Sequence, residues 1–219
     1  MDLGQNLKAK LLNFPREWDA RSCIEEMKEN GFKHWRQSEW IGWYFQYLCE
    51  NNLNTIFKIP GTSYGNVEFD GNAEGLNFDF KAHSLYNHRR SIQNVTILND
   101  KIAMEQSIRD NGRHGLLIAL TDCSYDISGE FKVWHQKFKG PESKYVKAGR
   151  KSGRPQRKLK TNAKVLKYLV LTITSENIHH LPLMMKQGKN SNGKPRLPKY
   201  KIDFGNLSLF SPIEIKIQV

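Results

Sequence analysis

Long apolar runs, cysteine and acidic side chains are all scarce in this sequence, and these shortages limit the classes of protein to which it can belong. No stretch approaches the about 18 consecutive apolar residues of a transmembrane helix, so no membrane partner is expected. The first ten residues, MDLGQNLKAK, lack the apolar segment of a secretory signal. The three cysteines (Cys23, Cys49 and Cys123) are widely spaced, odd in number and without a metal-ligand pattern, which indicates reduced thiols and a cytoplasmic location.

Basic residues outnumber acidic ones, and the excess is concentrated in one segment. The chain has 34 Lys and Arg against 22 Asp and Glu, a net charge of +12. Between Lys137 and Lys167, twelve basic residues stand against a single acid, Glu142, so this segment carries nearly all of the net charge. Such a balance in a globular chain favours nucleic acid as the partner. We expect residues 137–167 to be a segment that binds a polyanion.

The rest of the chain shows the periodicities of an α/β domain. Apolar residues recur at helical spacing within 37–51, and Asn99 is a plausible cap for a later helix. The expected order is helix, three strands, helix and strand, at residues 37–51, 55–60, 65–70, 76–83, 99–111 and 115–122. A helix over 19–31 precedes this series, and a strand over 164–174 follows it. The pattern predicts a central mixed β-sheet flanked by helices.

The stretch NFDFKAH (77–83) places unlike residues on the two faces of one strand. Strand alternation puts Phe78 and Phe80 on one face and Asp79, Lys81 and His83 on the other. Phosphodiester hydrolysis needs an activated water, stabilisation of developing charge and help for the leaving oxygen, which divalent metals held by carboxylates supply. A lysine beside the metal positions the water or the attacked phosphate. The strand offers one acid and the lysine of such a site.

A second acid must come from a neighbouring strand, where VEFD supplies both Glu68 and Asp70. If Asp70 pairs opposite Leu76, Asp70 and Asp79 fall on opposite faces of the sheet. If Asp70 pairs opposite Asn77, the two acids share a face and Glu68 lies directly across from Asp79. Either Glu68 or Asp70 is therefore the first ligand. A third acid, Glu39, is expected to approach from the flank of the helix over 37–51.

The pattern Asp70…Asp79-Phe80-Lys81, with an acid-bearing helix before it, resembles the PD-(D/E)xK nucleases, above all the type II restriction endonucleases. The resemblance covers roughly residues 35–122. It departs from the family in having Phe69, not proline, before Asp70, and in the short spacing of eight residues between the two acids.

The resemblance implies a single nuclease domain over 1–219, with a restriction-endonuclease-like catalytic core (35–122) and a basic DNA-recognition region (124–205). It implies Mg²⁺ held by Asp70 and Asp79, or by Glu68, with Lys81 at the water and Glu39 as an accessory acid. The partners it implies are double-stranded DNA, a second copy of the chain and a cognate DNA methyltransferase. A homodimer is expected because cutting both strands of a symmetric site requires two equivalent active sites.

Side chains that suit DNA contacts follow the acidic strand and fill the basic segment. His83 continues the face of Asp79 and Lys81, and Arg89 and Arg90 come soon after it. Arginine and amide side chains pair bidentately with guanine and adenine edges. The candidates for DNA binding are His83, Arg89, Arg90, Arg150, Arg154, Gln156, Arg157 and Asn162.

Three other functions fit parts of the sequence. A ββα-metal nuclease needs a strand histidine, and His179-His180 offers one, but no further ligands complete that motif. A non-catalytic DNA-binding protein explains the charge equally well, yet acids placed near a polyanion weaken binding unless a metal neutralises them. A repair or junction-resolving nuclease uses the same chemistry as a restriction enzyme.

Overall fold

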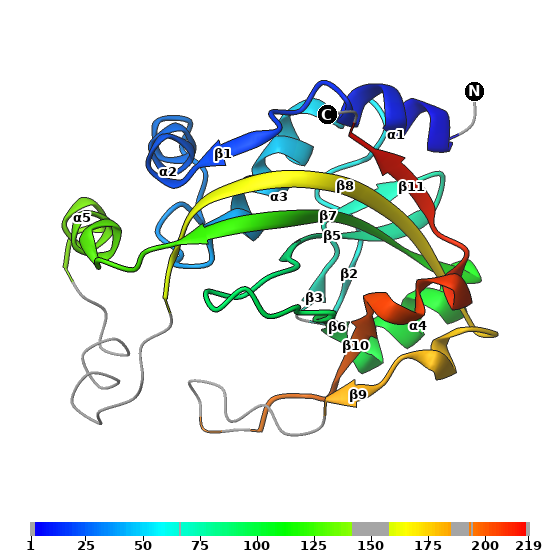
Figure 1. Cartoon of the computed structure of the whole chain (residues 1–219). Coiled ribbons are helices and arrows are strands. Elements are labelled where there is room, and N and C mark those ends of the chain that lie inside the picture. The colour runs from blue at the N-terminus through cyan, green and yellow to red at the C-terminus, as the bar shows by residue number, and fades with distance from the viewer. Residues whose placement is uncertain (1–2, 66, 142–157, 185–192, 194, 218–219) are drawn as a thin grey trace.

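A six-stranded mixed sheet forms the centre of the computed structural model, which describes residues 3–65, 67–141, 158–184, 193 and 195–217 (Figure 1). Its strand order is β1-β8-β7-β5-β4, and β11 pairs with β8 beside β1. The strands are β1 (Glu17–Asp19), β4 (Gly71–Ala73), β5 (Leu76–Ser84), β7 (Arg113–Tyr125), β8 (Lys160–Thr174) and β11 (Ile213–Lys216). Only β5 and β7 run parallel among these pairs, so the predicted α/β class with a mixed sheet is confirmed.

The parallel pair at the centre requires a crossover, and the segment between the two strands supplies it. This segment contains β6 (Val95–Asp100) and α4 (Lys101–Asn111), and Gly112 ends the helix in the left-handed conformation at φ 74°. Asp100 caps α4 through its carboxylate, in place of the predicted Asn99. The Asn99 side chain does not cap the helix and instead contacts Asp79 of β5.

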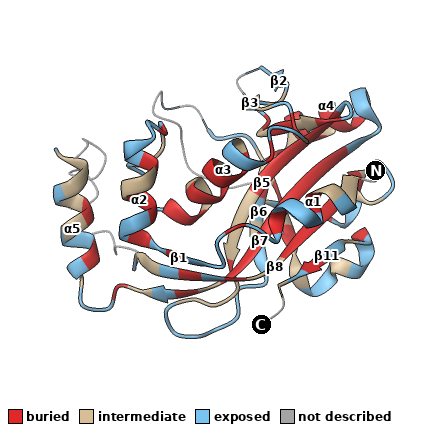
Figure 2. Ribbon diagram, turned by 90° about the horizontal axis from the view of Figure 1, so that it is seen from above, coloured by how far each residue is buried: buried red, intermediate tan, exposed pale blue. Residues whose placement is uncertain are grey.

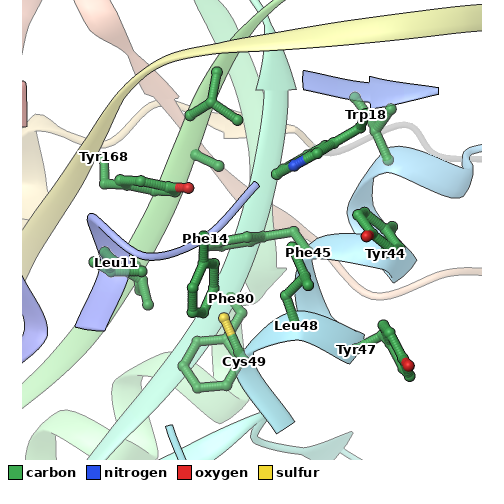
Figure 3. Packing of buried hydrophobic residues seen from close by; sticks show 14 of the residues in the cluster. Leu11, Phe14, Trp18, Tyr44, Phe45, Tyr47, Leu48, Cys49, Phe80 and Tyr168 are labelled. Atoms are coloured by element: carbon green, nitrogen blue, oxygen red, sulfur yellow. The ribbon is translucent and has the colours of Figure 1, made fainter. Parts of the chain in front are cut away.

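Three helices cover one face of the sheet. They are α1 (Leu3–Leu11), α2 (Ala20–Glu29, capped by Asp19) and α3 (Trp40–Asn52). Aromatic side chains fill the space between them and the strands (Figure 3). Phe45 of α3 stacks on Tyr168 of β8 at 5.9 Å between ring centroids, and Phe14 meets both rings edge-on. This packing fixes α3 across β5, with which it makes extensive contact.

The opposite face is covered by α4 and a smaller sheet in the order β6-β10-β9. The central strands β5, β7 and β8 are consequently buried along much of their length (Figure 2). The remaining elements are β9 (Leu183–Met184), β10 (Lys199–Asp203), the 3₁₀ helices η1 (Ile178–His180) and η2 (Phe204–Phe210), the hairpin β2 (Ser63–Tyr64) and β3 (Val67–Glu68), and α5 (Glu130–Lys139). Asp79, Lys81 and His83 lie on this second face, beside α4 and β6.

Two predicted strands differ in the structure. Residues 55–60 form a turn with one isolated bridge, Lys58 to Asn72, before the cis peptide at Pro60. Residues 65–70 do not form one strand, because 67–68 pair with β2 and the chain joins β5 only from Gly71 onwards. The turn into β5 is Glu74-Gly75, with φ of 51° and 82°, which is the geometry of a two-residue hairpin turn.

The region 124–205, predicted to recognise DNA, contributes to the core of the domain. Its strand β8 pairs with β7 along almost its whole length and is buried between β7 and β1. Strands from residues before and after 124 therefore belong to the same sheet. The cysteines Cys23, Cys49 and Cys123 are buried and form no disulfide. No helix in the described part of the chain combines the length and apolar character needed to cross a bilayer.

Candidate active site

Asp79 and Lys81 lie on β5 and project from the face that α4 and β6 cover. The Asp79 side chain is buried, whereas the Lys81 side chain is 28% exposed, and Lys81 Nζ lies 3.9 Å from Asp79 Oδ1. Phe78 and Phe80 point the other way into the aromatic core, as predicted. The phenylalanines therefore anchor the strand and hold its acid and lysine on the opposite face.

Asp70 joins this pair through the register of the hairpin. Gly71 pairs with Phe78, so the same register places Asp70 opposite Asp79 and not opposite Leu76 or Asn77. Neither predicted register is correct, because the two-residue turn lies at 74–75, one residue later than pairing of Asp70 with Asn77 requires. Asp70 Oδ2 accepts a 2.7 Å hydrogen bond from the amide of Phe80, the residue between Asp79 and Lys81.

The Asp79 carboxylate accepts hydrogen bonds from two residues outside β5. Asn99 Nδ2, at the end of β6, lies 3.0 Å from both carboxylate oxygens. His114 Nε2, at the start of β7, lies 3.1 Å from Oδ2, and the imidazole is fully buried. These donors keep a buried anion satisfied, which an isolated carboxylate in such a position would not be.

The two acids have opposite pKa shifts. Burial acts to raise the pKa of Asp79, but Lys81, His114 and Asn99 together outweigh it and lower that pKa to about 2. Burial raises the pKa of Asp70 to about 6, helped by the charge of Asp79 and opposed by Lys81. Burial acts to lower the pKa of Lys81, yet the two carboxylates raise it. At neutral pH the site thus holds two neighbouring carboxylates and one ammonium group.

The chain matches no family model, no curated protein and no solved structure.

The donor set fits a hard divalent cation such as Mg²⁺. Magnesium takes one or two carboxylates and keeps several waters, so Asp70 and Asp79 are a sufficient protein contribution. Burial is the main cause of the raised pKa of Asp70, and the charge of Asp79 adds to it, so a cation bound between the two carboxylates would lower that pKa. In the described part of the chain, no three His, Cys, Asp or Glu side chains group closely enough to hold a metal by themselves.

The structure places the other predicted acids away from Asp79. Glu68 is exposed on β3 and pairs with Ser63, so Asp70 is the acid of VEFD that reaches β5. Glu39 lies at the start of α3 and accepts a 2.7 Å ion pair from Lys160, with its side chain 54% exposed. The acid of α3 that acts on the site is Glu50, whose charge raises the pKa of Asp70.

Several residues predicted to bind DNA have partners within the protein. His83 donates to the carbonyl of Gln93 at 2.6 Å. Arg90, at φ 61°, makes two contacts to Asp122 at 2.6 and 3.0 Å, while Arg89 and Asn162 are exposed. The remaining predicted contacts lie outside the described residues: Arg150, Arg154, Gln156 and Arg157.

Four residues of the site were not predicted: Glu50, Asn99, His114 and Lys199. Lys199 of β10 pairs in register with Asp100, next to Asn99. Its pKa is lowered by burial and by the charges of Lys81 and Arg196, and Asp79 opposes the shift. A cation on β10 therefore lies near Asp79. Lys199 belongs to a stretch of the sequence, 186–201, that has six basic residues and no acidic one.

Proposed function

We propose that this chain is a Mg²⁺-dependent DNA endonuclease of the type II restriction class, which cuts both strands at a specific sequence. The observation that carries the proposal is the meeting of Asp70, Asp79 and Lys81 at one point from adjacent strands. Two carboxylates and a lysine are the minimal protein groups for metal-assisted phosphodiester hydrolysis. Asp70 and Asp79 would hold the ion, which supplies an activated water and charge stabilisation when bound.

The surroundings of the three residues support the assignment. Lys81 and Asp70 are both partly exposed, so these two members of the group can meet a phosphate or a water from solvent. Lys199 adds positive charge near Asp79, as expected for a site that receives a polyanion. The order α3, hairpin, β5, α4 and β7 supports a restriction-endonuclease-like core.

The net charge of +12 supports DNA as the substrate, because a chain of this charge attracts a phosphate backbone at any sequence. A double-strand cut at a symmetric site requires two active sites related by a two-fold axis, so we propose a homodimer. A cell that makes such an enzyme must protect its own sites, and the proposed functional partner is a cognate DNA methyltransferase.

The test is cleavage of plasmid DNA with Mg²⁺, with EDTA in place of Mg²⁺, and with the Lys81→Ala variant. Discrete fragments from the wild type alone are the expected result. Lys8→Ala is the matched control, because this exposed lysine lies on α1, which covers the other face of the sheet. Its fragments should match those of the wild type.

Other outcomes would identify another function. Binding without cleavage in every condition would indicate a DNA-binding protein and refute the nuclease. Nicking without sequence preference, or preferential cutting of a four-way junction, would keep the chemistry and refute the restriction class. Sedimentation of the protein with and without a cleaved oligonucleotide would show whether the active species is a dimer.

A further inference from the structure

A chain of buried side chains runs from the surface hairpin to the Asp79 carboxylate. Asn77 Oδ1 accepts from Thr62 Oγ at 2.7 Å and from Asn72 Nδ2 at 2.9 Å. Asn77 Nδ2 in turn donates to Ser107 Oγ at 3.3 Å. Ser107 Oγ lies 3.1 Å from His114 Nδ1, and His114 Nε2 completes the path to Asp79.

The ionised carboxylate fixes the direction of the bond that reaches it. A carboxylate only accepts, so His114 must carry a proton on Nε2 and donate it to Asp79. The Ser107 hydroxyl can either donate to Nδ1 or accept from it, so it is a partner for Nδ1 in both protonation states of the imidazole. Asn77 Nδ2 donates to the same hydroxyl and thereby holds it beside the ring.

The path also restricts how Asp79 can bind a cation. A carboxylate offers about four acceptor positions on its two oxygens. Asn99 uses one on each oxygen, and His114 uses a second on Oδ2. The position that stays open is on Oδ1, the oxygen that lies 3.9 Å from Lys81 Nζ.

We propose that His114 is a positioning residue for the metal site. It fixes Asp79 Oδ2 by a hydrogen bond from Nε2, while Ser107 holds the other side of the ring at Nδ1, so that only Oδ1, on the side of Lys81, remains available to the ion. His114 does not touch substrate and acts through Asp79. The inference rests on the proposed function, since it assigns the ion to the carboxylate of that site. Outer partners of metal ligands commonly contribute about 10–100-fold in metal affinity or activity.

Two substitutions at His114 separate positioning from packing. In His114→Gln the amide nitrogen can reach the place of Nε2 and still donate to Asp79. In His114→Asn the amide can reach only the place of Nδ1, so the donor to Asp79 is lost. Both variants leave a smaller side chain in the core. If His114 acts through packing alone, His114→Asn should lose more folding stability than His114→Gln, and neither should change the metal affinity specifically.

The measurements are the Mg²⁺ concentration for half-maximal cleavage and the dissociation constant of Mn²⁺ from the protein without DNA. Mn²⁺ binding is followed by the electron paramagnetic resonance signal of the unbound ion, which requires no activity. His114→Asn should raise both values roughly 10–100-fold, and His114→Gln should stay within about threefold of the wild type. The matched control is His135→Asn, because His135 is equally buried but lies on α5 among aromatic rings. It should change neither value.

Equal Mn²⁺ affinity in folded His114→Asn and the wild type would overturn the proposal. Equal losses in His114→Asn, His114→Gln and His135→Asn would overturn it too, because they would follow from core damage in general. If His114→Asn does not fold, Ser107→Ala provides the same test. It removes the partner of His114 Nδ1 with a small change in side-chain volume, so the ring is no longer held in place and Mn²⁺ binding should weaken. A wild type that cleaves DNA while the His114 variants behave normally refutes the positioning role alone. A wild type that neither binds Mn²⁺ nor cleaves refutes the proposed function.

Discussion

Replacing Asp70 by asparagine should make the folded protein more stable at pH 8, even though it removes a proposed metal ligand. The pKa of Asp70 is about 6 in the folded chain against a reference value of 3.8. The folded state therefore holds this proton more tightly than the unfolded state does. The stability that the neutral carboxyl provides is present below about pH 4 and is lost as the pH rises through 6.

The size of the effect follows from the shift. Each pKa unit corresponds to about 1.4 kcal/mol, so the rise of Asp70 to about 6 makes its ionisation cost about 3 kcal/mol of folding stability at pH 8. Asparagine carries no charge at any pH and can still accept from the Phe80 amide. At roughly 2–4 °C per kcal/mol for a chain of this size, the melting temperature should rise by up to about 10 °C.

The assay is urea unfolding in EDTA at pH 8 and at pH 4, followed by tryptophan fluorescence. The gain of Asp70→Asn should be large at pH 8 and close to zero at pH 4. Mg²⁺ should then stabilise the wild type and not the variant, because only the wild type keeps both ligands. Glu68→Gln is the control, since that acid is exposed and its loss should change stability by less than about 0.5 kcal/mol. A variant less stable than the wild type at pH 8, or a gain of the same size at both pH values, would refute the reasoning.

Three further substitutions test other parts of the structure. Glu50→Gln should lower the pH at which Mg²⁺ supports half-maximal cleavage, because its charge raises the pKa of Asp70, while Glu39→Gln should leave that pH profile unchanged. Gly115→Ala should destabilise by about 1–3 kcal/mol in urea unfolding, because its Cβ would lie 2.4 Å from the ring of Phe78; unchanged stability would mean that this contact relaxes freely. Glu74→Asn should stabilise by up to about 1 kcal/mol, because asparagine tolerates the φ of 51° better, and a loss in thermal unfolding would contradict this.

The sequence was most informative where a short period decides the structure. Alternation in NFDFKAH is enough to separate the phenylalanines from Asp79 and Lys81, and the structure places them on opposite faces as predicted. The apolar stretch over 115–122 likewise predicted a strand, which the structure shows as the buried part of β7, parallel to β5. Both are local patterns that need no knowledge of the partner strand.

Positions along an element could not be predicted in the same way. Glu39 and Glu50 are about three helical turns apart and lie on nearly the same side of α3. Periodicity therefore predicts the side of the helix on which an acid lies, but not which position along the helix axis meets the site. The two acids are separated by about 16 Å along the axis, and only packing of α3 on β5 decides which of them acts on Asp70. The hairpin register failed for a related reason, since it depends on the turn conformation at Glu74.

Asn99 and His114 carry no signal in a single sequence. Asn99 has the composition of a helix cap, and its contact to Asp79 exists only because Asp100 takes that role. His114 begins a strand that reads as ordinary core, and its partner Ser107 faces it from α4. Such contacts arise from the crossover between β5 and β7, which brings together residues that no local pattern connects.

Because of the same crossover, contacts on the two sides of the sheet join residues at different separations along the chain, so we expect them to form at different times during folding. Asp79 is 20 residues from Asn99 and 35 from His114, whereas Trp40 on the other side donates to the carbonyl of Lys160, 120 residues away. Because the entropy of closing a loop grows with its length, contacts of short range form first during folding. In pulse-labelled refolding, the amides of β5 and the start of β7 should gain protection before those of β1. The segment that carries the acids would then be structured before β8 pairs with β7 and β1 to complete the sheet.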